Sequence, residues 1–469
     1  MLDTAIRNAE IVTAADRYRA EIGIRGGRIV TIAEDVGAAH EDIDASGLLV
    51  LPGGIDAHVH LEQPQGGGVV MADGFESGTR SAAAGGTTTV MPFALQQKGQ
   101  SLREAVTAYH KAAEGKCHTD TSFHLIITDP TPQVLGQELP ALVKDGYTSF
   151  KVFMTYDDMV LNDAQLLDVF DVARREKALV MVHAEGYDAI RYMAKRLEET
   201  GRTAPYYHAE SRPQSVEREA THRAISHAEL TDVPICIVHV SGRDPMEQIQ
   251  WAKKRGMNVW AETCPQYIAL TAENLKGLNM DFEGAKYVCS PPPRDLDSQQ
   301  AIWEGLRDGT FDLFSSDHCP FRFEDAMGKD VAGARTSFRW VPNGIPGIEA
   351  RLPILFSEGV SKGRIPIERF VALTSTNPAK LFGMYPRKGT IAVGSDADLT
   401  FWDPGREVTM SQSLHHHDCD YTPYEGMAIK GWPVRTILRG STIFQDGEIT
   451  GLPGQGTYLE RGTSQAFGV

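Results

Sequence analysis

Hydrophobic and polar positions follow two different patterns along this chain, and the change between them predicts its organisation. Residues 1–50 and the residues after 385 alternate apolar and polar positions in short runs with Gly-rich turns between them, which is typical of antiparallel β-strands. Between these two ends, short apolar runs alternate with helical stretches, which favours parallel βαβ units.

The central region contains a repeated strand-and-helix pattern. Its eight apolar runs cover residues 54–61, 87–94, 122–128, 149–156, 178–185, 235–241, 258–264 and 313–320. Helical stretches between them include residues 101–115, 164–177, 245–256 and 298–309. Eight such units predict an α/β fold with a (β/α)8 barrel over residues 51–384. The insertions at residues 186–230 and 321–345 are expected to cover an active site.

The two ends of the chain resemble each other in character, which predicts one small domain built from both. We expect residues 1–50 and 385–445 to form a composite β-sandwich, with the barrel inserted between its halves. Residues 446–469 are rich in Gly, Thr and Ser, and we expect this tail to lie on a surface or against a neighbouring subunit, or to be loose.

Composition restricts the partners and the compartment. The chain of 469 residues carries 46 basic and 62 acidic side chains, and the net charge of −16 argues against nucleic acid or an anionic membrane as a partner. Its six cysteines form no CxxC pair, which predicts reduced thiols in the cytoplasm. The N-terminus lacks the apolar core of a signal peptide, and no apolar run is long enough to predict a transmembrane helix.

Histidines and an aspartate stand at the ends of several predicted strands. His58 and His60 are one residue apart, so in a strand both imidazoles leave the same face. His183, His239 and Asp317 end later runs. Each has an ordinary alternative, because a lone strand histidine is often a core residue and an aspartate often caps a turn. Since barrel strands end at one face, the set together predicts a metal site.

Lys151 is the unusual member of this set, because it stands inside an apolar run. Burying an unpaired ammonium group is costly, although the long stem could also lie on apolar surface with its head in water. A neutral amine can react with carbon dioxide, and both oxygens of the resulting carbamate can bridge two metal ions. The donor set then predicts two Zn²⁺ ions, with Mn²⁺ as the alternative.

Two metal ions that share one activated water are typical of hydrolases. The sequence contains no GxSxG elbow for a serine nucleophile. No GxGxxG or Walker motif follows a predicted strand.

Several ordered motifs resemble a known family. They are GGIDAHVHL, SFKVFMTY, MVHAE, IVHVS, ETCPQY, VCSPPPR, SDHCPF and VPNGIPGIE. Together they resemble the cyclic amidohydrolases of the D-hydantoinase and dihydropyrimidinase family over nearly the whole chain. The resemblance implies hydrolytic opening of hydantoins or dihydropyrimidines to N-carbamoyl amino acids, and a homotetramer.

The resemblance also implies roles for individual residues. One metal would be held by His58, His60 and Asp317, the other by His183 and His239, with carboxylated Lys151 as the bridge. Tyr156 would bind the substrate carbonyl oxygen, and Ser290 and Asn343 the amide edges of the ring. Asp317 would carry a proton from the attacking water to the leaving nitrogen.

Some positions depart from the family pattern or leave alternatives open. The segment after His60 lacks the arginine that would grip a carboxylate, which disfavours dihydroorotate. Gln63, the run 65–68 and the run 91–93 differ from many relatives, and we expect them in loops that face the substrate. The alternatives are an allantoinase, another cyclic imide hydrolase, or a non-enzymatic scaffold, which the intact metal-ligand set disfavours.

Overall fold

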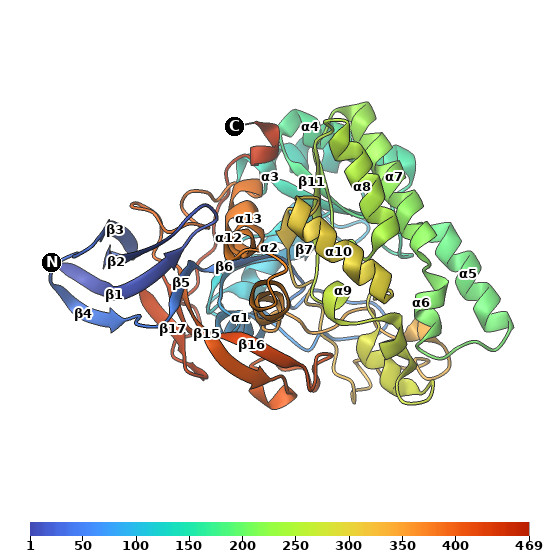
Figure 1. The fold of residues 1–469 in the computed structure, drawn as a ribbon. Coiled ribbons are helices and arrows are strands. Elements are labelled where there is room, and N and C mark those ends of the chain that lie inside the picture. Colours follow the sequence, from blue (N-terminus) through green and yellow to red (C-terminus); the bar gives the residue numbers. More distant parts are fainter. Residues whose placement is uncertain (469) are drawn as a thin grey trace.

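The computed structural model of the protein describes residues 1–468, which form two sheets (Figure 1). The first contains a parallel barrel whose strands are hydrogen-bonded in chain order. These strands are β6 (Gly54–Val59), β7 (Thr87–Leu95), β9 (His124–Ile126), β10 (Ser149–Phe153), β11 (Leu179–His183), β12 (Ile235–Ile237), β13 (Val259–Thr263) and β14 (Leu313–Phe314). All eight apolar runs are therefore confirmed as strands, and the short β8 (Asp120–Thr121) pairs beside β7.

The barrel closes between its first strand and the segment that follows its last. Val59 forms a parallel bridge with His318, and the amide of His60 donates a hydrogen bond of 2.7 Å to the His318 carbonyl. This contact brings the end of β6 beside Asp317, so one wall of the candidate site lies on the closing seam.

Helices cover the outside of the barrel, and the four helical stretches predicted from periodicity are confirmed. They are α2 (Leu102–Ala113), α4 (Asp163–Glu176), α8 (Arg243–Lys254) and α10 (Leu296–Asp308). The others are α1 (Phe75–Ala84), α3 (Leu139–Lys144), α5 (Tyr187–Glu199), α6 (Tyr207–Ser211), α7 (Gln214–Thr231), α9 (Gln266–Ala269), α11 (Arg351–Leu355), α12 (Ile367–Val371) and α13 (Asn377–Leu381). No helix within residues 1–468 is long and apolar enough to cross a membrane.

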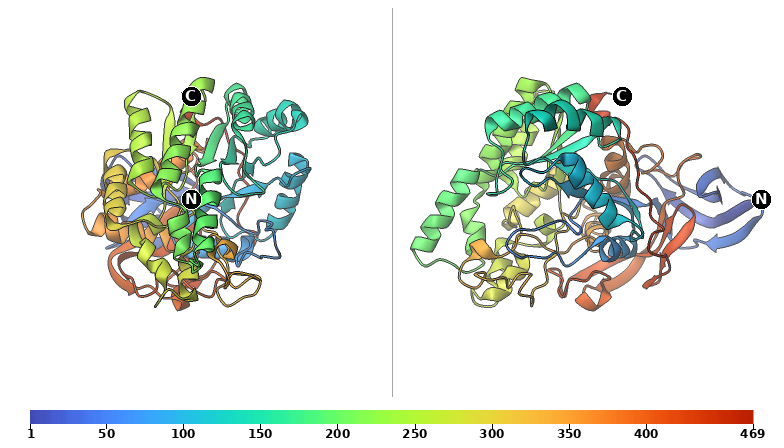
Figure 2. Two further views of the ribbon diagram at one scale, coloured as in Figure 1. Left: turned by 90° about the vertical axis from the view of Figure 1, so that its right-hand side faces the viewer. Right: turned by 180° about the vertical axis from the view of Figure 1, so that it is seen from behind.

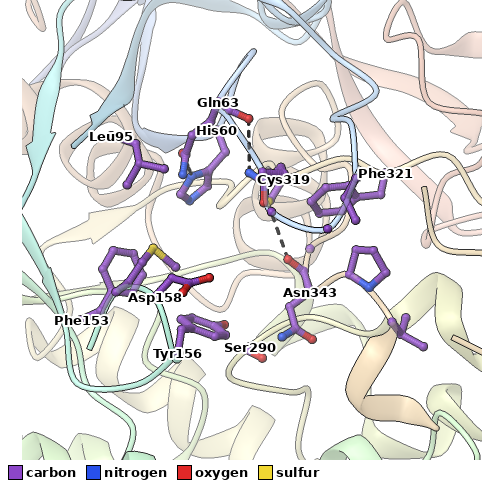
Figure 3. A pocket seen from close by; sticks show the side chains of 18 of the residues that line it. His60, Gln63, Leu95, Phe153, Tyr156, Asp158, Ser290, Cys319, Phe321 and Asn343 are labelled. Carbon is purple, nitrogen blue, oxygen red and sulfur yellow. Dashed lines mark hydrogen bonds between the residues drawn. The ribbon is translucent and has the colours of Figure 1, made fainter. Parts of the chain in front are cut away.

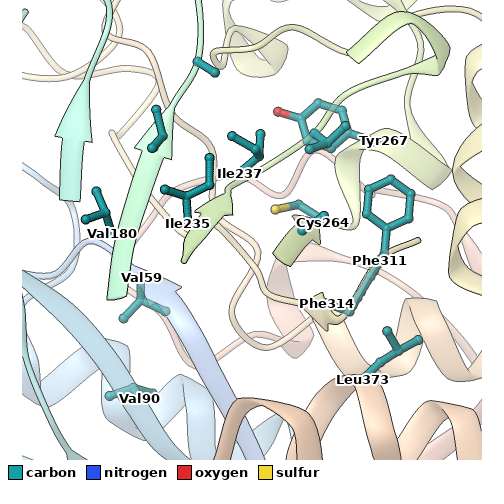
Figure 4. Close-up of a cluster of buried hydrophobic side chains, with 14 of the residues drawn as sticks. Val59, Val90, Val180, Ile235, Ile237, Cys264, Tyr267, Phe311, Phe314 and Leu373 are labelled. Carbon is teal, nitrogen blue, oxygen red and sulfur yellow. The ribbon is translucent and has the colours of Figure 1, made fainter. Parts of the chain in front are cut away.

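Strand periodicity decides which side chains enter the barrel. In β10, Phe150 and Val152 point outward into the large core between strands and helices, and their neighbour Lys151 points inward. In β11, Val180 and Val182 also point outward, so the next residue, His183, points inward. Figure 4 shows this outer core, where strand valines and isoleucines meet Tyr267, Phe311 and Phe314.

The second sheet is made from both ends of the chain, as predicted. Its strands are β1 (Leu2–Val12), β2 (Arg17–Arg25), β3 (Arg28–Ala33), β4 (Ala39–Asp44), β5 (Leu49–Pro52), β15 (Leu399–Thr409), β16 (Ala428–Leu438), β17 (Ser441–Gln445) and β18 (Glu448–Ile449). The two halves join where β5 pairs with β15. This small domain extends to one side of the barrel, with the N-terminus at its outer end (Figures 1 and 2). The domain limits at residues 50 and 385 stay a prediction.

A buried ion network joins the small domain to the barrel. The Lys388 ammonium lies 2.7 Å from an Asp120 oxygen of β8, 2.5 Å from Asp398 and 3.1 Å from Asp396. Arg439 adds a second cation against Asp120. Lys388 and its three partners are nearly inaccessible to water, so each charge depends on the others for compensation.

The C-terminal tail packs against the N-terminal ends of the barrel strands. Arg461 is buried, and its guanidinium donates hydrogen bonds to Ser149 Oγ (2.8 Å) and to the Phe123 carbonyl (2.6 Å). The amide of Leu459 donates to the Thr121 carbonyl at 2.7 Å. A contact between this tail and a neighbouring subunit stays a prediction.

We expect Lys388→Met to destabilise the fold. Removing the ammonium that contacts three buried carboxylates should lower the free energy of unfolding by about 3–5 kcal/mol, measured by urea denaturation. The matched control is Lys430→Met, whose exposed ammonium lies 3.6 Å from Glu407 and which should cost less than about 0.5 kcal/mol. Equal midpoints for the two variants would contradict the role assigned to the network.

Candidate metal centre and active site

The predicted site residues line one cavity of about 600 Å³, reached from the C-terminal ends of the barrel strands (Figure 3). Its lining includes His58, His60, Lys151, Tyr156, His183, His239, Ser290, Asp317 and Asn343. The structure therefore brings together every residue proposed from the sequence as a metal ligand or substrate contact. The loop of residues 321–345 also contributes to the wall, as expected for an active-site cover.

Three residues form a compact group of potential metal ligands. Asp317 Oδ1 lies 3.3 Å from His58 Nε2 and 3.4 Å from His60 Nε2. One donor atom from each residue lies within 4.8 Å of the other two, so this group could hold a metal ion. Burial alone would raise the pKa of Asp317, but the charges of His58 and His60 outweigh it and lower the pKa.

Two further imidazoles adjoin this group. The rings of His183 and His239 lie 4.4 Å apart, and His239 lies 5.4 Å from His58. His183 Nε2 donates to Glu185 at 2.7 Å, which leaves Nδ1 available as a donor atom for a metal ion. His239 Nδ1 is buried and has no hydrogen-bond partner among residues 1–468. These two histidines can supply a second set of donors.

Lys151 adjoins the first of these sets. Its Nζ is 3.2 Å from His58 Nε2 and faces the rings of Phe93 and Phe153 at 5.1 and 5.3 Å. Its side chain is fully buried, so the alternative of a head group in water is wrong. Burial lowers the pKa of Lys151 to about 8, which increases the fraction of neutral amine near pH 7 to 8.

Three of the site residues hold strained backbone conformations. Tyr156, Asp317 and His239 have φ angles of 73°, 49° and 40°, in the left-handed region that residues with a Cβ rarely adopt. Such strain persists only where the surrounding structure imposes it, and it clusters at functional sites. Here it follows strands β10, β12 and β14, at the points where the chain turns away from the barrel.

A second layer of polar groups orients the histidines. His58 Nδ1 donates to Glu262 Oε1 at 2.7 Å, and His60 Nδ1 donates to Gln63 Oε1 at 2.7 Å. Glu262 also accepts from the His239 amide at 3.1 Å. These bonds direct Nε2 of both rings toward Asp317. Sequence reasoning missed Glu262, although the need of each ligand histidine for an acceptor was a general signal.

The proposed substrate contacts occupy one wall. Burial raises the pKa of Tyr156, so its phenol stays protonated as a donor. Ser290 Oγ lies 3.2 Å from His208 Nε2, and Asn343 Oδ1 is buried without a hydrogen-bond partner within residues 1–468. The buried Lys329 ammonium ties the loops of these two residues together, donating to the carbonyls of Val288 (2.9 Å) and Pro342 (2.6 Å).

The expectation for residues 91–93 is wrong. They lie within β7, paired on both sides, and are buried rather than in a loop that faces the substrate. The Phe93 ring instead packs on His58 and His60 at 4.8 and 4.9 Å. By contrast, Gln65, Gly66 and Gly67 do line the cavity mouth.

Comparison with known proteins agrees with this geometry. The sequence pattern of the Amidohydrolase family matches residues 49–443. The chain belongs to this family. The D-hydantoinase of Rhizobium radiobacter is 46% identical over 461 residues, covering 98% of this chain and 99% of the relative. The D-hydantoinase of Geobacillus stearothermophilus is 47% identical, covering 97% and 96%.

Solved structures of amidohydrolases share the fold. The dihydropyrimidinase of Brevibacillus agri NCHU1002 superposes with a TM-score of 0.95 at 44% identity, covering 99% of both chains. The L-hydantoinase (dihydropyrimidinase) of Arthrobacter aurescens gives 0.88 at 29% identity, covering 98% of this chain and 100% of the other. The predicted resemblance to the D-hydantoinase and dihydropyrimidinase group is confirmed.

We expect Glu262→Gln to weaken metal binding. The neutral amide is a poorer acceptor for His58 Nδ1, and loss of such a partner typically costs about 10- to 100-fold in metal affinity. Zinc titration in chelator buffers measures this. The control is Glu407→Gln, an exposed carboxylate on β15. An unchanged affinity in the Glu262 variant would contradict its orienting role.

Proposed function

We propose that this chain hydrolyses the ring amide of hydantoins or dihydropyrimidines and releases N-carbamoyl amino acids. The observation that carries the proposal is the convergence of His58, His60 and Asp317, two more imidazoles and a buried amine in one cavity of an amidohydrolase barrel. Relatives named D-hydantoinase at 45–47% identity over nearly the full chain support this reaction over the allantoinase alternative. The intact donor set also disfavours a non-enzymatic scaffold.

The donor set fits two divalent ions. Four imidazoles and one carboxylate suit zinc, with manganese as the alternative. We assign His58, His60 and Asp317 to one ion and His183 and His239 to the other. Carboxylation of Lys151 would replace a buried cation by an anion between them, which removes the charge conflict. Bound there, the ions supply Lewis-acid polarisation of the ring carbonyl and an activated water.

The protein side chains then divide the remaining tasks. Tyr156 donates a hydrogen bond to the carbonyl oxygen as negative charge develops on it. Backbone groups at Ser290 and Asn343 hold the amide edges of the ring and fix its orientation. Asp317, kept ionised by its histidine neighbours, accepts the proton of the attacking water. It then delivers that proton to the ring nitrogen as the carbon–nitrogen bond breaks.

Two properties of the whole molecule belong to the same proposal. All six cysteines are free thiols, which suits the cytoplasm as the compartment. We also propose a homotetramer, on the strength of the family resemblance alone.

A small substrate panel tests the reaction. After zinc reconstitution, we expect ring opening of hydantoin, dihydrouracil and 5-phenylhydantoin, followed by loss of absorbance of the ring amide and by detection of the carbamoyl product. Comparing kcat/KM across these rings with allantoin and a cyclic imide identifies the preferred class. Activity on allantoin alone would overturn the proposal in favour of the alternative.

We expect Lys151→Ala to abolish ring opening and to bind less than two zinc ions per chain, because the bridge between the two donor sets is lost. Metal analysis after reconstitution measures the stoichiometry. Short carboxylic acids such as acetate should restore part of the activity if they occupy the place of the carbamate. A Lys151→Ala variant that binds two zinc ions per chain and keeps full activity would contradict the carbamate bridge.

A further inference from the structure

Two adjacent carboxylates on the loop after β10 border the cavity mouth but differ in their partners. Asp157 Oδ1 accepts a hydrogen bond of 2.5 Å from the Tyr187 hydroxyl on α5. Arg191 donates to that hydroxyl at 2.9 Å. Asp158 makes no hydrogen bond or ion pair within the described residues, and its carboxylate projects into the cavity beside Tyr156 (Figure 3). Both carboxylates therefore line the cavity, but only that of Asp157 is held by a hydrogen bond from α5.

The opposite border of the mouth is the loop of residues 63–69. A Cβ on Gly66 would lie 4.0 Å from Asp158 Oδ2, so the carboxylate reaches across to this loop. Gln65 lines the same opening with a polar amide. These two loops, together with residues 331–343, border the opening of the cavity.

Neither Arg339 nor Lys98 forms an ion pair with Asp158 within residues 1–468. Arg339 lies 3.1 Å from Glu198 of α5, and Lys98 Nζ donates to the backbone carbonyl of Asp157 at 3.4 Å. Asp158 thus contributes a negative charge at the opening that forms no direct ion pair within residues 1–468. Its surroundings deeper in the cavity are apolar, since Leu95, Phe153 and Met159 line the wall next to it.

We propose that Asp158 selects the ring substituent of the substrate. It favours substituents with an aliphatic stem and a terminal ammonium, and it disfavours substituents that end in a carboxylate. This inference rests on the proposed function, because a ring held at Tyr156 and the two donor sets directs its substituent toward the mouth. The apolar wall contacts the stem, and Asp158 pairs with the ammonium.

The substrate class is therefore the 5-(aminoalkyl)hydantoins. Water adds to the ring carbonyl next to the substituted carbon, and the bond from that carbonyl to the ring nitrogen breaks. The nitrogen takes up a proton, and the product is an N-carbamoyl amino acid with its side-chain ammonium unchanged.

The test compares three hydantoins of similar side-chain length. They carry a 4-aminobutyl, a 3-carboxypropyl or a neutral pentyl group at C5. For the wild type at low salt, we expect kcat/KM for the ammonium substrate to exceed that for the carboxylate substrate about tenfold. The ratio should fall in 0.5 M NaCl, because salt screens an exposed charge.

Two variants that each remove one negative charge separate the effect of the Asp158 carboxylate from that of the overall charge. Asp158→Asn should reduce the ammonium-to-carboxylate ratio to about twofold or less, whereas Asp157→Asn should keep most of it. An equal fall in both variants would overturn the inference and assign the preference to the overall charge of −16. A wild-type ratio near one, or a ratio unaffected by Asp158→Asn, would overturn it as well.

The neutral substrate keeps this inference separate from the proposed function. If the zinc-loaded enzyme opens none of the three rings, the proposed function fails. If it opens the pentyl compound but shows no charge preference that depends on Asp158, only the inference about Asp158 fails.

Discussion

The site depends on one buried amine, which is enclosed at the centre of the barrel. An imidazole and two phenyl rings, rather than carboxylates, contact it. Lys151 has no access to water, and its Nζ lies 3.2 Å from His58 Nε2. A group in this position must lose its proton or gain a negative substituent, because an uncompensated buried ammonium is costly. Phe150 and Val152 pack outward from the same strand, which keeps the side chain of Lys151 inside the barrel. A group of potential metal donors, His58, His60 and Asp317, adjoins the amine.

Much of the barrel and of the inner site could be predicted from the sequence, because both follow from periodicity. A strand places alternate residues on one face, and parallel strands end at one edge, so His58, His183 and Asp317 converge without knowledge of any long-range contact. The polar edge strand β4 escaped detection, since the segment AHEDID has almost no apolar positions. The run 91–93 lies inside the apolar run 87–94, whose pattern predicts a strand, and its residues pair within β7 rather than lying in a loop that faces the substrate.

The supporting groups could not be predicted in the same way. Glu262 lies on a different strand from His58, 204 positions away, and nothing in its local sequence indicates which histidine it orients. Lys329 likewise contacts two carbonyls in loops distant in sequence. The first of these contacts depends on how two strands of the barrel face each other, and the others depend on how loops cross above it. Single-residue patterns carry no information on either. Local periodicity therefore indicates where the candidate ligands converge, and only the tertiary structure shows which groups orient them.

The buried guanidinium of Arg461 has a consequence for how the molecule is made. Its partners, Ser149 and the Phe123 carbonyl, leave the ribosome more than 300 residues earlier. Until the tail emerges, the floor of the nascent barrel is uncovered, including the apolar surface that later packs on Leu459 and Ala466. All strands of the barrel are thus synthesised before the segment that covers their N-terminal ends. The interval between the two is when the growing chain most needs protection from aggregation.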